Sequence, residues 1–278
     1  MPPALLHPVA TLDWTAFTVH WSTVTGLLAL LGLYEWRARA AARNPEGGAP
    51  PSAAQRARFV AGLGAIFLSL NGPLHDLSES YLFTAHMVQH LVLTLVVPPL
   101  LISGAPASFF RPALRWGAVA RVARAITRPL VAYALFNVVL VAWHFPQAYE
   151  LAVRVHPMHI TQHLVFMTAA VIMWWPLLSP LPELPRLPYP MQLLYCFAMT
   201  IPMSIVAIFI TYADSVLYAS YASAPRVVGI SPMEDQILGG LVMWIPGGFY
   251  FLGVMGVVFF RWAGADSDSV AAAQPASR

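Results

Sequence analysis

Two copies of a short pattern place pairs of histidines one helical turn apart. The first copy is His86-Met-Val-Gln-His90, and the second is His159-Ile-Thr-Gln-His163. Because side chains at positions i and i+4 share one face of a helix, each copy predicts a vertical pair of imidazoles. Imidazole suits zinc, copper, iron and nickel, and it is a poor ligand for calcium or magnesium. If the two helices face each other, four imidazoles converge on one small volume, which favours a metal or haem site.

Other polar and sulfur-containing side chains could surround or complete a site formed by these histidines. Amide and carboxylate groups could hydrogen-bond the free ring nitrogens and fix their tautomers, and thioethers would favour Cu(I). The hydrogen-bonding candidates are Gln89, Gln162, Asp235 and Gln236, and the thioether candidates are Met87, Met158, Met203 and Met233. The methionines and Asp235 also have plainer interpretations: methionines commonly fill apolar cores, and Asp235 at a helix start is a favourable N-terminal charge.

These residues lie in a chain whose composition indicates a lipid environment. Of its 278 residues, 58% are hydrophobic and 10% are charged, whereas soluble domains carry about 25% charged residues. Apolar segments near the length that spans about 30 Å of hydrocarbon are predicted at 14–34, 59–75, 84–104, 129–145, 159–179, 190–212 and 235–260. The sequence therefore predicts an all-α integral membrane protein with one seven-helix domain over residues 1–265 and a disordered cytoplasmic tail over 266–278.

The arginines predict the orientation of this domain. All 15 basic residues are arginines, and all but Arg154 and Arg226 fall in alternate loops and the C-terminal tail. The excess of positive charge marks the cytoplasmic side, so the N-terminus is expected outside and the C-terminus in the cytoplasm. All nine histidines then lie on the outer side. Cytoplasmic retention also accounts for the net charge of +3 without a nucleic-acid partner.

A weak internal repeat indicates how the helices are organised. The third and fifth predicted spans begin with the two histidine motifs, and the seventh begins with Met233-Glu-Asp-Gln236 at nearly the same offset. This predicts a parallel repeat of three helix pairs after a lone first helix. The chain has a single cysteine, Cys196, so an intrachain disulfide is excluded and a thiolate metal clamp is not expected.

The motifs taken together resemble a known family. The two His-x-x-Gln-His motifs, Trp143-His144, and Asp235-Gln236 followed by Met243-Trp-Ile-Pro-Gly247 resemble the multi-spanning CtaG family of bacterial assembly factors for caa-type cytochrome c oxidases. The resemblance covers about residues 14–262. It implies a multi-pass protein of the bacterial cytoplasmic membrane that helps to form the copper centre of the oxidase catalytic subunit. The implied partners are that subunit and an extracytoplasmic copper chaperone.

The resemblance also ranks the candidate ligands. The best copper-ligand candidates are His86, His90, His159 and His163, followed by His75, Asp76 and His144. His20 is a further candidate, and it is equally well interpreted as an interhelical hydrogen-bonding residue.

Four functions are compatible with these residues. The first hypothesis is a copper-binding assembly factor that is not an enzyme. The second is a haem b electron carrier, although the inner half of the predicted bundle has no histidine for a second haem. The third is a zinc membrane hydrolase. The chain lacks the H-E-x-x-H signature of such enzymes, so Asp76 or Glu79 would have to act as the general base. The fourth is a copper transporter, which needs ionisable or soft groups across the whole membrane.

Overall fold

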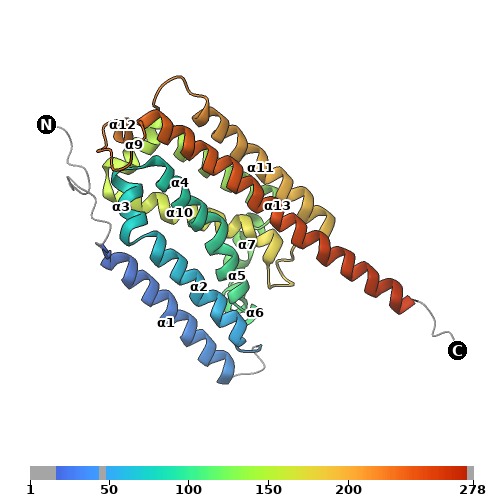
Figure 1. Ribbon diagram of the computed structural model, residues 1–278. Helices are drawn as coiled ribbons and strands as arrows, with labels where there is room; N and C mark the ends of the chain where they lie inside the picture. The colour runs from blue at the N-terminus through green and yellow to red at the C-terminus, as the bar shows by residue number, and fades with distance from the viewer. Residues whose placement is uncertain (1–16, 44–47, 274–278) are drawn as a thin grey trace.

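The structure is a computed structural model that describes residues 17–43 and 48–273, with the side chains of 267–273 left out (Figure 1). This part of the chain is helical and contains no strand. The long helices are α1 (Trp21–Arg43), α2 (Ala53–Ser69), α8 (Pro129–His144), α10 (His156–Leu178), α11 (Tyr189–Thr211) and α13 (Pro232–Ala273). The shorter elements are α3 (Gly72–Ser80), α4 (Phe83–Leu91), the π-helical turn η2 (Val92–Val96), α5 (Val97–Gly104), α6 (Ala107–Leu114), α7 (Gly117–Ile126), α9 (Pro146–Arg154) and α12 (Ala219–Ala222).

Several of these helices are long and apolar enough to cross a membrane. Within the described residues there are four such spans, at Phe83–Gly104, His156–Leu178, Tyr189–Thr211 and Pro232–Asp266. Two further pairs qualify if each bent pair is one span: α2 with α3, bent by 46°, and α7 with α8, bent by 74°. The protein is therefore a helical multi-pass membrane protein with four to six candidate spans.

Each of the seven predicted apolar segments corresponds to helix in the structure, although the boundaries differ. The first helix begins at Trp21 rather than near residue 14, and it is not among the candidate spans. The short helices α6, α7, α9 and α12 lie in segments that we interpreted as loops. Helix α13 continues to Ala273, into the segment predicted as a disordered tail. The remainder of that tail, and His7, lie outside the described residues.

The helices pack so that the span containing α4 and α5 lies at the centre of the bundle with α10 (Figure 1). Helices α1 and α2 flank this centre on one side, and α11 and α13 flank it on the other, where α13 packs along both α11 and α4. Large apolar side chains cover the outside, for example Leu194, Phe197 and Phe209 on α11. An exposed apolar surface of this kind is the one that lipid requires.

The π-helical turn η2 interrupts the central span directly after Leu91, the last residue of α4. Its carbonyl groups accept side-chain hydrogen bonds: Trp174 Nε1 donates to the Thr94 carbonyl at 2.9 Å, and the Tyr250 hydroxyl donates to the Leu95 carbonyl at 2.6 Å. Pro98 follows, and it has no N–H to donate to the preceding turn. These bonds satisfy backbone groups that lipid could not, and they fix α10 and α13 to the central helix.

A sharp bend separates α2 from α3 and turns α3 toward the centre of the bundle. Gly72 lies at the bend with φ +67°, a left-handed conformation that glycine adopts without strain. A Cβ atom there would also lie 2.5 Å from the Phe17 ring. Asn71 holds the bend by accepting a 2.7 Å hydrogen bond from the His20 backbone N–H and donating to the Phe67 carbonyl. The bend directs the side chains of His75 and Glu79 inward.

Candidate metal centre

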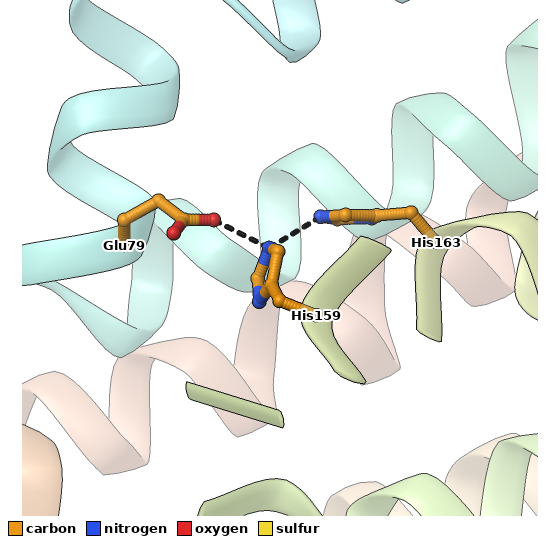
Figure 2. A group of neighbouring side chains, drawn as sticks. All are labelled: Glu79, His159 and His163. Atoms are coloured by element: carbon orange, nitrogen blue, oxygen red, sulfur yellow. Dashed lines mark hydrogen bonds and ion pairs between the residues drawn. The ribbon is translucent and has the colours of Figure 1, made fainter. Parts of the chain in front are cut away.

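Glu79 of α3 and His159 and His163 of α10 form a buried group of potential ligands (Figure 2). His159 lies between the other two: its Nε2 contacts Glu79 Oε1 and lies 2.7 Å from His163 Nε2. All three residues are at least nine-tenths buried. One carboxylate oxygen and two imidazole nitrogens lie within 4.8 Å of one another, so they could serve as ligands of one cation.

The donor atoms of this group fit a transition metal once His159 separates slightly from both His163 and Glu79. Two nitrogen ligands of a tetrahedral zinc ion, each about 2.0–2.1 Å from the metal, lie about 3.3 Å apart. The Nε2 atoms of His159 and His163 lie closer than this, at 2.7 Å. A hydrogen bond between the two imidazoles accounts for the 2.7 Å separation. A metal cation in place of the shared proton would be neutralised in part by the carboxylate of Glu79. Two imidazoles and a carboxylate suit Cu(II) or zinc.

The first histidine motif lies against the second. The rings of His86 and His90 stack at 4.3 Å, and the ring of His90 lies 5.4 Å from that of His163. The ring of His86 lies 6.1 Å from that of His159. The structure therefore brings all four imidazoles of the two motifs together, although His86 and His90 are not part of the closest group. Both are buried.

His75 lies next to Glu79, and His20 packs against His75. His75 Nδ1 lies 3.8 Å from Glu79 Oε1 and 3.3 Å from Gln89 Nε2, and Gln89 Nε2 also donates to the Ser69 carbonyl. The ring of His20 packs edge-on against that of His75, with 4.4 Å between the ring centroids. Gln89 thus contacts an imidazole, as the sequence suggested, but this imidazole is His75 rather than a member of its own motif.

Several candidates from the sequence bond elsewhere. Asp76 accepts a hydrogen bond from the Thr18 hydroxyl at 2.9 Å. Asp235 accepts from the backbone N–H groups of Phe83 and Thr84, where it caps the start of α4. Gln236 bonds backbone groups as well, for example the Leu217 N–H at 2.6 Å. Asp235 therefore caps a helix and Gln236 holds the loop after α11, and neither bonds a ring nitrogen in these contacts.

The thioethers and the remaining polar candidates are spread over the bundle. Gln162 is buried, and its Oε1 has no hydrogen-bond partner among the described residues. Met158 and Met233 are half-buried, and Met233 Sδ lies 3.9 Å from Gln236 Nε2. The other two thioether candidates, Met87 and Met203, line a separate cavity with His144.

Tyrosines close the bundle over the histidines. The Tyr149 hydroxyl donates to that of Tyr221 at 3.1 Å, the Tyr221 hydroxyl donates to the Ser78 carbonyl, and the Tyr218 hydroxyl donates to the His144 carbonyl at 3.0 Å. Burial raises the pKa of Tyr149 and of Tyr221 well above the ordinary phenol value, so both remain protonated donors at neutral pH. This layer, from α9 and the loop around α12, holds the end of α3 next to Glu79.

A cavity of about 390 Å³ gives access to the group from the side of the bundle. It runs between α1 and α10, and its walls are mostly apolar, including Leu27, Leu30 and Met167. Glu79, His159 and His163 all line it. The ligand atoms are thus buried within the bundle but remain reachable from this cavity.

Glu79 is the residue that the sequence did not identify as a ligand. Its position, four residues after His75, is the signal that could have found it, because the spacing puts both side chains on one helical face. The segment 59–75 was expected to be one continuous helix that ends at His75, and the bend at Gly72 was not foreseen.

The fold and this group define a class: a polytopic helical membrane protein with histidines and a carboxylate buried at one end of the bundle. The chain belongs to the cytochrome c oxidase caa3 assembly factor family (Caa3_CtaG), whose model matches residues 30–265. This confirms the family that the motifs indicated.

Curated relatives match more distantly. Uncharacterized proteins of Mycobacterium bovis and Mycobacterium tuberculosis are each 24% identical over 203 residues, and one of Mycobacterium leprae is 22% identical over the same length. The matches cover 67% of this chain and 31% of each relative, so the chain spans about a third of the length of these proteins. No solved structure matches the chain.

Proposed function

We propose that this protein binds copper at the Glu79–His159–His163 group and passes it to the catalytic subunit of a cytochrome c oxidase. The observation that carries the proposal is the convergence of one carboxylate oxygen and two imidazole nitrogens within 4.8 Å, in a chain that belongs to an oxidase assembly family. Copper is cargo in this function, so no catalytic residue is required. An extracytoplasmic copper chaperone is the expected donor.

The membrane topology that suits this role has seven spans, with α1 as the first. A helix of 23 residues is about 35 Å long, which is enough to cross the hydrocarbon. Arginines hold the end of the bundle opposite the histidines: Arg37 donates to the Ser108 carbonyl at 2.7 Å, and Arg58 donates to the Ser103 carbonyl at 3.1 Å. Placing this basic end in the cytoplasm puts the metal group on the outer side of the bacterial cytoplasmic membrane.

Zinc is the second candidate for the same group. A carboxylate with two imidazoles is also the donor set of catalytic zinc in some hydrolases, where a water takes the fourth position. The cavity lined by Glu79 and His159 could admit that water. A zinc-binding chain would therefore point to hydrolysis rather than delivery.

Metal loading tests the proposal. The protein purified in detergent is stripped with a chelator, exposed to equal concentrations of Cu(II) and zinc, desalted and measured by inductively coupled plasma mass spectrometry. We expect copper to be retained in preference to zinc, with nitrogen hyperfine structure in the electron paramagnetic resonance spectrum. The double variant Glu79→Gln/His159→Ala should weaken copper binding by about tenfold or more, because it removes two of three ligands.

The matched control is His156→Ala, which removes an exposed imidazole at the start of the same helix; His156 lines the cavity but is not part of the ligand group. It should leave copper binding unchanged. Equal copper affinity in the wild type and in the Glu79→Gln/His159→Ala variant would contradict the proposed site. Preferential zinc retention that the double variant abolishes would keep the site and replace the cargo.

A further inference from the structure

A second chamber lies deeper in the bundle, and its lining is rich in thioethers. It is a cavity of about 30 Å³ enclosed by the central span, α8, α10, α11 and α13. Four of the eleven methionines of the chain line it, namely Met87, Met199, Met203 and Met243. All four are at most 6% exposed. A volume of this size holds one water molecule or one ion, and it excludes an organic ligand or a haem.

Two imidazoles line the same chamber. His90 is 7% exposed, and its Nε2 has no hydrogen-bond partner among the described residues, although buried polar atoms are nearly always paired. His144 Nδ1 lies 2.6 Å from the Leu140 carbonyl. Since a carbonyl only accepts, Nδ1 carries the proton, and the lone pair of the neutral ring is on Nε2. This bond thus fixes the tautomer in which His144 Nε2 is available as a ligand.

Aromatic and amide groups hold these donors in place. Phe166 packs edge-on against both imidazole rings, with its centroid 4.9 Å from that of His90 and 6.3 Å from that of His144. Asn137 Nδ2 lies 3.7 Å from Met199 Sδ. Gly247 of α13 leaves room for Met203, whose Sδ would lie 3.0 Å from a Cβ atom at that position. The thioether of Met203 therefore occupies space that a larger residue at 247 would take.

The charge of the lining selects among metal ions. The thirteen residues that line the chamber include no carboxylate. A divalent ion would thus bring two uncompensated charges into a dry interior, whereas a monovalent ion brings one, and burial of unpaired charge is costly. Thioether and imidazole donors also suit soft Cu(I). We propose that the chamber lined by Met87, Met199, Met203, Met243, His90 and His144 is a second metal site, selective for Cu(I).

This inference rests on the proposed copper-handling function and adds a site to it. The two sites are neighbours, because the ring of His90, in the chamber, lies 5.4 Å from that of His163, in the carboxylate group. Their chemistry differs: the first offers a carboxylate and suits Cu(II), and the second offers neutral soft donors. This difference allows each site to be tested without the other.

The experiment measures Cu(I) binding under anaerobic conditions by competition with a chromophoric Cu(I) chelator, and it records the copper K-edge X-ray absorption of the bound ion. The wild type should show sulfur neighbours around copper. The triple variant Met199→Leu/Met203→Leu/Met243→Leu removes three of the four thioethers and nearly conserves side-chain volume. It should lose most of the sulfur signal and weaken Cu(I) binding by about tenfold or more. Ag(I), a soft monovalent ion, should follow the same pattern.

Two variants separate the sites. Met173→Leu changes a buried methionine that does not line the chamber, and it should leave Cu(I) binding unchanged. Glu79→Gln/His159→Ala should keep the sulfur-coordinated Cu(I) while losing Cu(II). Cu(I) with nitrogen neighbours alone in the wild type would overturn the second site and leave the first intact. Loss of Cu(I) from Glu79→Gln/His159→Ala but not from the methionine variant would do the same. The wild-type absorption spectrum decides the matter if the triple variant fails to fold.

Discussion

At the scale of single residues, Asp235 shows how a buried charge is accommodated in this bundle. It is fully buried, and its carboxylate accepts hydrogen bonds from the Phe83 and Thr84 N–H groups at 2.8 and 3.0 Å. These groups belong to the start of α4, where the helix dipole also favours a negative charge. The pairing joins α13 to α4 one turn before His86, so it sets the position of the first histidine motif.

Neutralising this residue should therefore weaken the bundle. Asp235→Asn keeps the shape of the side chain but replaces one carboxylate oxygen by an NH₂ group, which cannot accept a hydrogen bond. One of the two backbone N–H groups then loses its acceptor, and the other keeps only a neutral amide oxygen. Hydrogen bonds to charged groups contribute about 1.5–3 kcal/mol each, and we expect a clear drop in the thermal unfolding midpoint in detergent, measured by intrinsic fluorescence. Asp214→Asn is the control, because Asp214 is exposed. An unchanged midpoint for Asp235→Asn would mean that its two hydrogen bonds are not stabilising.

Residue spacing predicted part of the site and missed the rest for physical reasons. The i, i+4 pattern placed His159 and His163 on one helical face, and the structure has them in contact. Glu79 was not identified because its direction depends on the left-handed backbone at Gly72, which turns α3 inward. The hydrogen-bonding role expected of Asp235 went instead to a helix end, since backbone N–H groups at a buried terminus compete for any carboxylate nearby.

At the scale of helices, close approach between elements depends on glycine at particular positions. Gly104, at the end of α5, faces α2: a Cβ atom there would lie 2.7 Å from the Phe59 backbone nitrogen and 2.9 Å from its Cα. The Gly104 carbonyl also accepts a 3.0 Å hydrogen bond from the Tyr34 hydroxyl on α1. Three helices therefore meet at this glycine.

Gly104→Ala should force α2 and α5 apart, because the clash is with backbone that no rotamer change can relieve. Overpacking of a well-packed contact typically costs about 1–3 kcal/mol. We expect lower thermal stability and less monodisperse protein by size-exclusion chromatography. Gly64→Ala, where the added Cβ meets nothing within 4 Å, is the matched control on α2. Equal behaviour of the two variants would show that α2 and α5 can separate without penalty.

The helices themselves were largely predictable, and their interruptions were not. Apolar runs mark every long helix because lipid imposes the same requirement on each span. The bends after α2 and before α8, and the π-helical turn η2, leave hydropathy unchanged and so leave no trace in such a pattern. The prolines at 98 and 99 are visible in the sequence and mark an irregularity of the helix. The hydrogen bonds that stabilise η2 are not visible, because their donors, Trp174 and Tyr250, lie on helices far away in the chain.

At the scale of the whole molecule, charge divides the bundle into two ends. The histidines, Glu79 and the tyrosine layer lie at one end, with α9 and α12 (Figure 1), and the arginine contacts of α6 lie at the other. The proposed orientation, with the histidine end outside, follows from the positive-inside rule. The histidine end is thus expected to face the extracytoplasmic side, where the proposed copper donor lies, and the arginine end is expected to face the cytoplasm.

Cysteine accessibility in whole cells tests this orientation. Ala222→Cys on α12 and Ala118→Cys on α7 each introduce a thiol at an exposed position, and the native Cys196 is buried. A membrane-impermeant maleimide should label Ala222→Cys in intact cells, and it should label Ala118→Cys only after permeabilisation. The reverse pattern would place the histidine end in the cytoplasm and remove the expected route from an extracytoplasmic donor.

The π-helical turn has a consequence for how the central helix divides its contacts. A π turn accommodates about one extra residue, which advances the helical phase by about 100°. The half before the turn, α4, packs with α3 and α13 and carries His86 and His90, whereas the half after it, α5, packs with α2 and α10. The two halves of the central span therefore face different neighbouring helices, with the turn setting the rotation between them. Small shifts of α5 against α2 and α10 need not rotate His86 and His90 on α4.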